Sequence, residues 1–181
     1  MTESLTLQTA TGSIAVDISM FSNVTGSQQP PAVALIKTNT GSIDTRFSLF
    51  AIDSKDNVRV PSGGSFHIDT KSDTSSVHVK FDDAPVDSTL ALTSKTSTGS
   101  IDVDLHPTYE GSFSLSSDLS SPVVNVKEGV EDPAGEGRKR TVKFVRSRGH
   151  LMVGEVTWGN TRVDGSRVDL KANVGTPRLS L

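Results

Sequence analysis

The sequence predicts an all-β protein of repeated strand–turn–strand units, and a β-solenoid is the arrangement we favour. One hexapeptide occurs three times, and apolar residues alternate with polar ones on both sides of it. No segment has the apolar spacing of an amphipathic helix, and Pro, Gly, Ser and Thr interrupt every window long enough to hold one. Almost the whole chain is therefore expected to be β-structure.

The hexapeptide marks the units. It reads TATGSI at 9–14, TNTGSI at 38–43 and TSTGSI at 96–101, so successive copies begin 29 and then 58 residues apart. Because 58 is twice 29, one degenerate copy is expected between the second and the third, with residues 66–81 as the candidate. A fixed period of this size is typical of stacked repeats.

Each copy is expected to place a tight turn between two half-buried strands. Leu5 and Leu7 precede the first copy at a period of two, and Ile14, Val16 and Ile18 follow it in the same way. Glycine enters the left-handed region of backbone space without a Cβ penalty, so it suits the turn. The glycines assigned to these structural turns are Gly12, Gly41 and Gly99.

Later apolar segments are expected to be worn copies of the same unit, in chain order. They pair 113–115 with 123–126, 142–145 with 150–153, and 168–170 with 179–181. Between them, residues 127–137 are rich in Glu, Gly and Pro and predict a flexible loop. The length of 181 residues predicts a single domain over 1–181.

Two arrangements fit this pattern. In a β-solenoid the glycine is a corner and successive copies stack, with Thr9, Thr40 and Thr98 aligned along one edge. In an antiparallel β-sandwich the glycine lies in a hairpin loop, and the copies are merely similar hairpins. We favour the solenoid because near-identical residues recur at the turn itself, as stacking like on like would require.

Composition removes several classes of protein. Ser and Thr make up 45 of the 181 residues, which predicts a thin or layered core. No apolar run approaches the roughly 20 residues of a membrane span, so none is expected. Residues 1–20 have no pattern of a secretory signal, and the absence of cysteine excludes disulfides and thiolate chemistry without deciding the compartment.

Charge is uneven along the chain. Residues 1–137 carry 8 Lys and Arg against 18 Asp and Glu, whereas residues 138–181 carry 10 against 3. The basic segment could bind a polyanion, or it could be a basic edge strand that pairs with the chain's own acids and resists aggregation. We favour the edge strand, because only Phe144 offers a stacking ring there. The candidate anion-binding residues are Arg138, Lys139, Arg140, Lys143, Arg146 and Arg148.

No catalytic, metal or cofactor site is predicted. The histidines at 67, 78, 106 and 150 are scattered singly, and no phosphate-binding loop is present. Asp102 and Asp104 flank Val103 and should share one strand face, with Asp17 and Asp44 in comparable places. We interpret them as the solvated face of a strand. A concave groove lined by Asp102, Asp104 and a nearby Arg or Lys would instead favour an enzyme.

The Thr-x-Thr-Gly-Ser-Ile run with its flanking alternation resembles the adhesin-like β-solenoid repeat family of unknown function, and within it the fungal members. The resemblance covers residues 4–105 clearly and 112–181 by pattern alone. It implies a repetitive β-architecture, a surface or scaffold role, and a cell-surface or extracellular location, although the residues themselves fit a cytoplasmic protein equally. The family has no catalytic residues to carry over.

The predicted function is therefore a non-catalytic surface, adhesion or scaffold module with a protein or glycan partner. The first alternative is a small carbohydrate-active enzyme or glycan-binding domain on a β-helix. The second is a polyanion-binding module that uses the basic segment 138–148.

Overall fold

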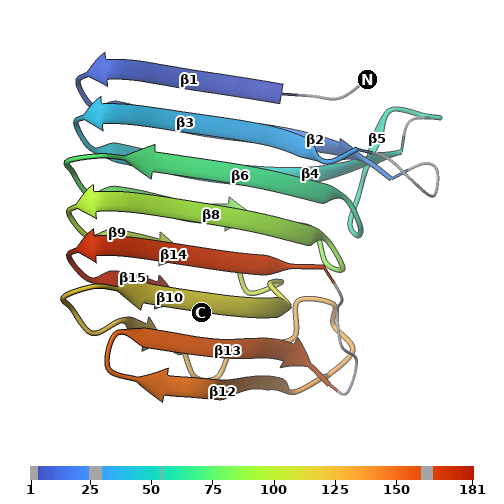
Figure 1. Cartoon of the computed structure of the whole chain (residues 1–181). Coiled ribbons are helices and arrows are strands. Elements are labelled where there is room, and N and C mark those ends of the chain that lie inside the picture. The colour runs from blue at the N-terminus through green and yellow to red at the C-terminus, as the bar shows by residue number, and fades with distance from the viewer. Residues whose placement is uncertain (1–3, 25–29, 54, 160–164) are drawn as a thin grey trace.

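The protein is all β, which confirms the predicted fold class at that level. The computed structural model describes residues 4–24, 30–53, 55–159 and 165–181. Over these ranges it contains fifteen strands in two facing sheets and no helix (Figure 1). The described residues accordingly include no helix long and apolar enough to cross a membrane.

Sheet A is mixed and sheet B is parallel along its main path. The strands of sheet A, in spatial order, are β1 (Ser4–Thr11), β3 (Ala32–Thr40), β6 (Ser65–Ser72), β8 (Thr89–Thr98), β14 (Arg167–Val174), β10 (Gly111–Ser117), β13 (Leu151–Trp158) and β12 (Arg140–Arg148). Those of sheet B are β11 (Val123–Asn125), β15 (Pro177–Ser180), β9 (Ile101–Asp104), β7 (Val77–Asp83), β4 (Ile43–Asp53) and β2 (Ile14–Asn23), with β5 (Val58–Val60) antiparallel to β4.

Most of the chain is organised in units that place one strand in each sheet, and we call such a unit a layer. Along the stack the layers are β1–β2, β3–β4, β6–β7, β8–β9, β14–β15 and β10–β11, and neighbouring layers pair in parallel (Figure 1). Residues 66–81, the expected degenerate copy, lie in β6–β7, between the second and the fourth layer. Each of these turns joins a strand of sheet A to a strand of sheet B and not two paired strands. The turn glycines therefore do not lie in hairpin loops, which is what the sandwich alternative expected.

The turn glycines share one backbone conformation. The φ angles of Gly12, Gly41 and Gly99 are 117°, 136° and 130°, values that L side chains rarely adopt. Gly175 has φ 127° at the same place in the β14–β15 layer, and sequence analysis did not single it out. Its signal was available, since Gly175 also stands between two alternating segments.

Stacking adds a second requirement for glycine. A Cβ on Gly41 would overlap the carbonyl group of Gly12 in the layer before it, and a Cβ on Gly175 would overlap that of Gly99. A Cβ on Gly12 would meet nothing within 4 Å, because no described layer lies beyond the first one. The neighbouring turn, and not φ alone, therefore excludes a side chain inside the stack.

Inward hydroxyls tie four of the layers to the turn of the preceding layer in the stack. In each case a buried Ser or Thr near the end of a sheet A strand donates to a turn carbonyl one layer away, which satisfies an acceptor in a tightly packed turn. The bonds run from Thr38 to Gly12 (3.1 Å), Ser72 to Gly41 (3.0 Å), Thr96 to Ser75 (2.8 Å) and Ser117 to Gly175 (3.0 Å). These contacts account for hydroxyl residues on the inward side of strands.

The expected alignment of Thr9 with Thr40 and Thr98 was wrong by two residues at Thr9. Thr9 lies opposite Thr38, and Thr11 lies opposite Thr40, so Thr9 and Thr40 are not in one row. The physical reason is the period of two, because residues two apart along a strand lie in different rows. Thr38 is buried and bonds a turn, whereas Thr40 is exposed.

The core is a single apolar layer between the sheets. Alternate residues of each strand point inward, so that Ile43, Val77 and Ile101 form one fully buried row across β4, β7 and β9. Phe47 and Phe81 stack in a parallel row four residues further along these strands, with ring centroids 5.5 Å apart. Full burial of each such side chain contributes about 1.5–3 kcal/mol.

The order of the layers departs from the order of the chain. The C-terminal layer β14–β15 lies between β8–β9 and β10–β11, although β10–β11 comes first in sequence (Figure 1). Residues 142–145 and 150–153 form an antiparallel hairpin, β12–β13, within sheet A and not a layer. We expected the later segments to be degenerate copies stacked in chain order, and this was wrong for residues 142–181. The β12–β13 hairpin occupies the edge of sheet A beyond β10, and the last layer pairs beside β8.

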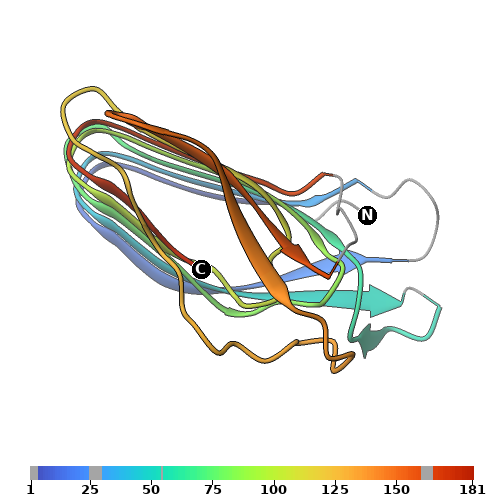
Figure 2. The same ribbon diagram turned by 90° about the horizontal axis from the view of Figure 1, so that it is seen from below.

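Beyond the last layer, sheet A continues further than sheet B. The β12–β13 hairpin extends sheet A past β10, whereas sheet B ends at β11. Viewed along the stack, the segment between β11 and β12 runs below the hairpin (Figure 2). The segment 127–137, expected to be a loop, contains no strand.

Candidate functional site

The outer face of sheet B carries two rows of polar side chains that cross the strands. One row runs Asp44, His78, Asp102 and Arg178 over β4, β7, β9 and β15. The other runs Asp17, Arg46, Lys80, Asp104, Ser180 and Asn125 over β2, β4, β7, β9, β15 and β11. Parallel register brings these residues together from segments more than 100 positions apart, with rows about 7 Å apart along the strands.

The expectation for the four aspartates is met in part. Asp102 and Asp104 share the outward face of β9, as the alternation around Val103 requires. Asp44 lies in the row of Asp102, however, and Asp17 lies in the row of Asp104. Asp17 and Asp44 therefore do not occupy equivalent positions.

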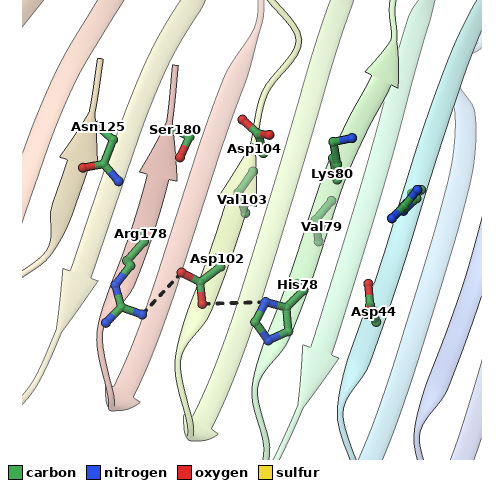
Figure 3. A pocket seen from close by; sticks show the side chains of 11 residues that line it. Asp44, His78, Val79, Lys80, Asp102, Val103, Asp104, Asn125, Arg178 and Ser180 are labelled. Atoms are coloured by element: carbon green, nitrogen blue, oxygen red, sulfur yellow. Dashed lines mark hydrogen bonds and ion pairs between the residues drawn. The ribbon is translucent and has the colours of Figure 1, made fainter. Parts of the chain in front are cut away.

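These rows line a shallow groove of about 340 Å³ (Figure 3). Asp102 lies between two partners, with 3.3 Å to the Arg178 guanidinium and 3.7 Å to His78 Nδ1. Asp104 is 3.2 Å from Lys127 Nζ. The groove also includes Arg46 and Lys80, so it has the composition that was expected to favour an enzyme.

The two carboxylates of the groove on β9 lie in similar, partly exposed surroundings. Glycoside hydrolysis needs one carboxyl that keeps its proton in an apolar setting beside one that is ionised. The side chains of Asp102 and Asp104 are 34% and 39% exposed, and each faces a cation. Such solvated pairs contribute about 0–1 kcal/mol each, so a ligand could displace them at little cost.

Rings for stacking on a sugar are sparse on this face. Trp158 and Tyr109 are both buried, and burial raises the pKa of Tyr109 above its usual value. Phe21 and Phe50 stack on the outer face of sheet B with centroids 5.4 Å apart, and Arg59 lies 3.8 Å over the Phe50 ring. The polar rows, and not aromatic rings, would therefore carry recognition in the groove.

The histidines do not gather at a site. His67 and His78 face outward from their strands, as expected. His106 is half-buried, which lowers its pKa, and its Nδ1 lies 2.9 Å from Thr108 Oγ1. Within the described ranges, no group of three or more His, Asp and Glu side chains could hold a metal ion.

The six candidate anion-binding residues fall into separate environments. Most of them lie on β12, which is the edge strand of sheet A, as the favoured interpretation of the basic segment anticipated. The register with β13 turns Lys143 toward the outer face, and after the bulge it does the same for Arg146 and Arg148. Arg140 lies opposite Trp158 on the inner face, while Lys139 is exposed just before the strand.

Arg138 is neutralised by the chain itself. Its guanidinium is 2.9 Å from Asp132, 3.4 Å from Glu110 and 3.5 Å from Glu136. The hydrogen bond from the Arg138 side chain, with backbone N–H groups of residues 134 and 138, holds the pKa of Asp132 well below its usual range. Sequence analysis missed this cluster, because Asp132 meets Arg138 only when the loop closes back on itself and Glu110 lies 28 positions away in the sequence.

Comparisons with known proteins place the chain in no family. No family model, curated protein or solved structure matches it.

Proposed function

We propose that the protein is a non-catalytic scaffold or adhesion module of the β-solenoid type, and that it associates with a second copy of itself through the open edges of β1 and β2. The solenoid is supported by the parallel, in-register pairing of equivalent strands and turns. The observation that carries the functional proposal is that both sheets end, at the same end of the stack, on long strands with one edge unpaired in the described structure.

The open edge presents a regular set of backbone groups. The backbone N–H groups of Ile14 and Val24 donate to the carbonyls of Ser42 and Ile52 on the β4 side. The even-numbered residues of β2 therefore direct their backbone N–H and C=O groups toward β4. The alternate residues, Ala15, Asp17, Ser19 and Phe21, direct their N–H and C=O groups toward the open edge. An unpaired strand of this length is a template for a further strand.

The other end of the stack carries the features that prevent such pairing. Edge strand β12 has four basic residues and a bulge between Phe144 and Arg146, and edge strand β11 spans only three residues. By contrast, β1 contains no charged residue and β2 contains only Asp17. Charge and irregularity thus protect one end and leave the other available.

A two-fold arrangement would use both edges at once. Rotation about an axis perpendicular to the sheets places β1 antiparallel to its own copy and β2 antiparallel to its own copy, which closes the assembly as a dimer. The near absence of charge on these strands means that no row of like charges opposes the contact.

The test places lysines on the open edge. Ala15→Lys with Ser19→Lys changes exposed side chains and should convert a concentration-dependent dimer into a monomer in sedimentation velocity. The matched control is Ser48→Lys, which lies opposite Ser19 on a strand already paired on both sides. A wild-type protein that stays monomeric at all concentrations, or a dimer unaffected by the edge lysines, would contradict the proposal.

A second candidate function, oligosaccharide binding, is favoured by the groove. Carboxylate, amide and guanidinium groups from four or more strands there offer paired donors and acceptors suited to adjacent sugar hydroxyls. Binding on a glycan array that is lost in Asp102→Asn and kept in Lys95→Gln, on the opposite sheet, would support it. Release of a shortened sugar from the bound glycan would identify the enzyme instead.

A further inference from the structure

A second pocket, separate from the groove and from the open edge, lies at the protected end of the stack. It has a volume of about 510 Å³ and lies between the segment that follows β11 and the start of β12. One wall is formed by Val126 and Val130, and the other by Val142 and Phe144. Ligand pockets in proteins are typically about 300–1,000 Å³ and mostly apolar, with a few polar groups that orient the ligand.

Arg140 contributes to this pocket, and its buried guanidinium has no hydrogen-bond partner among the described residues. The nitrogens Nε, Nη1 and Nη2 are all closed off from solvent, and none has a hydrogen-bond acceptor among the described residues. Five N–H donors removed from water without an acceptor are strongly unfavourable, and burial accordingly lowers the pKa of Arg140. Arg138, two residues earlier, has three acidic partners by comparison.

The surroundings of Arg140 indicate what would satisfy it. Its guanidinium carbon is 6.0 Å from the centre of the Trp158 ring, and the rest of the pocket wall combines apolar residues (Val126, Val130, Val142 and Phe144) with charged ones. A guanidinium binds a carboxylate through two parallel hydrogen bonds, and such charge-assisted bonds are strongest away from water. The acid on the pocket wall is Glu128, which is exposed and forms no bond to Arg140.

We propose that this pocket binds a small amphipathic carboxylate: the Arg140 side chain turns from its covered position to pair with the carboxylate, and the apolar body lies between Val126 and Phe144. Val126 and Phe144 are 42% and 46% exposed, so an apolar ligand would cover surface that now faces water. Two of the other basic residues on the pocket wall already have acidic partners, since Lys127 pairs with Asp104 and Arg138 with three acids, while Lys143, Arg146 and Arg148 face the other side of β12.

The chain has a built-in reporter for this site. Trp158 is the only tryptophan, so its fluorescence reports directly on the environment of Arg140. Titration of the full chain with sodium octanoate should give a saturable change in emission, with calorimetry as an independent measure. Octanol, which has the same body without the charge, and inorganic phosphate, which has charge without the body, should each bind at least tenfold more weakly.

Arg140→Met should weaken octanoate binding at least tenfold, while Arg146→Gln, an exposed charge on the other face, should leave it unchanged. Phe144→Ala should weaken octanoate binding and leave acetate binding unchanged, which separates the apolar body from the charge. Arg140→Met should also be at least as resistant to urea as the wild type, because it removes an unpaired buried charge. A less stable Arg140→Met would indicate a structural arginine.

Equal binding of octanol and octanoate, or octanoate binding that survives Arg140→Met, would overturn the proposal. Phosphate binding as strong as octanoate binding would reduce the site to a general oxyanion site and overturn the assignment of an amphipathic ligand. If Arg140→Met fails to fold, Arg140→Lys keeps the charge but loses the bidentate geometry, and unchanged octanoate affinity in that variant would count against the proposal.

Discussion

At the scale of single residues, two small groups let the turns of neighbouring layers pack closely: the turn glycines and the inward hydroxyls. A turn such as that at Gly41 must have positive φ and must also let the neighbouring turn approach its Cα. The hydroxyl of Thr38 then donates to the carbonyl of Gly12, so the turn has a bonded acceptor where packing excludes water. Both roles depend on stacking, which a single unit does not have.

Gly41→Ala should therefore destabilise the protein more than Gly12→Ala. Positive φ should cost each variant about 1–2 kcal/mol, and at Gly41 the added Cβ also displaces the backbone of the Gly12 turn, for a total of about 3 kcal/mol or more. Gly12→Val should cost about 1 kcal/mol or more, because only φ opposes it. Urea unfolding measures all three, and equal losses at Gly41 and Gly12 would contradict the role assigned to stacking.

Thr38→Val tests the hydroxyl contacts. The change keeps the shape of the side chain and removes the donor to the Gly12 carbonyl, so we expect a loss of about 1 kcal/mol. Thr40→Val in the same motif alters an exposed side chain and should stay within about 0.5 kcal/mol of the wild type. Similar values for the two variants in chemical denaturation would remove this explanation for the hydroxyl-rich composition.

At the scale of elements, the segment between β11 and β12 is closed by one carboxylate. Asp132 accepts hydrogen bonds from the backbone at residues 134, 136 and 138 and from the Arg138 side chain. The same Arg138 contacts Glu110, which accepts the backbone N–H of Trp158. A long connection is thereby joined to the β12–β13 hairpin that ends the stack.

This arrangement predicts a pH dependence of stability. The pKa of Asp132 is lowered in the folded state, chiefly by the hydrogen bond from Arg138, so its contribution is present above the ordinary value of 3.8. That contribution should decrease as the pH falls below 3.8 toward the folded-state pKa. Asp132→Asn should therefore be less stable than the wild type at pH 7, and the gap should narrow in urea titrations below pH 4. A constant gap would argue against an ionised Asp132.

At the scale of the whole molecule, the insertion of the last layer makes the C-terminal segment central. The strands β14 and β15 each pair with strands on both sides, and Leu170 and Leu179 lie in the core. The facing edges of β8–β9 and β10–β11 stay unpaired until residues 167–180 fold between them. Folding therefore depends on contacts between segments far apart in the sequence.

Leu170→Ala should accordingly cost about 3 kcal/mol, although it lies only eleven positions from the end of the sequence. Leu5→Ala, a comparable change in the partly exposed β1, should cost about 1 kcal/mol. Differential scanning calorimetry compares the two. A Leu170→Ala variant no less stable than Leu5→Ala would show that the last layer is peripheral after all.

The local chemistry of this protein could be predicted from its sequence, since the alternation of apolar residues, the glycine turns and the absence of helices depend on near neighbours. The edge position of the basic segment was also within reach. The groove was not, because Asp102 and Arg178 meet only through the register of β9 and β15. Arg138 and Arg140 look alike in sequence, but one meets three acids and the other none among the described residues.

The sequence by itself determined an all-β chain with glycine turns at regular spacing, because side-chain periodicity and backbone sterics act over a few residues. Only the tertiary structure decided which layers are neighbours, which glycine lies against the backbone of a neighbouring turn, and which charged side chains form pairs. The physical reason is that strand pairing between distant segments has no local signal in the sequence. The insertion of β14–β15 beside β8–β9 is the clearest case.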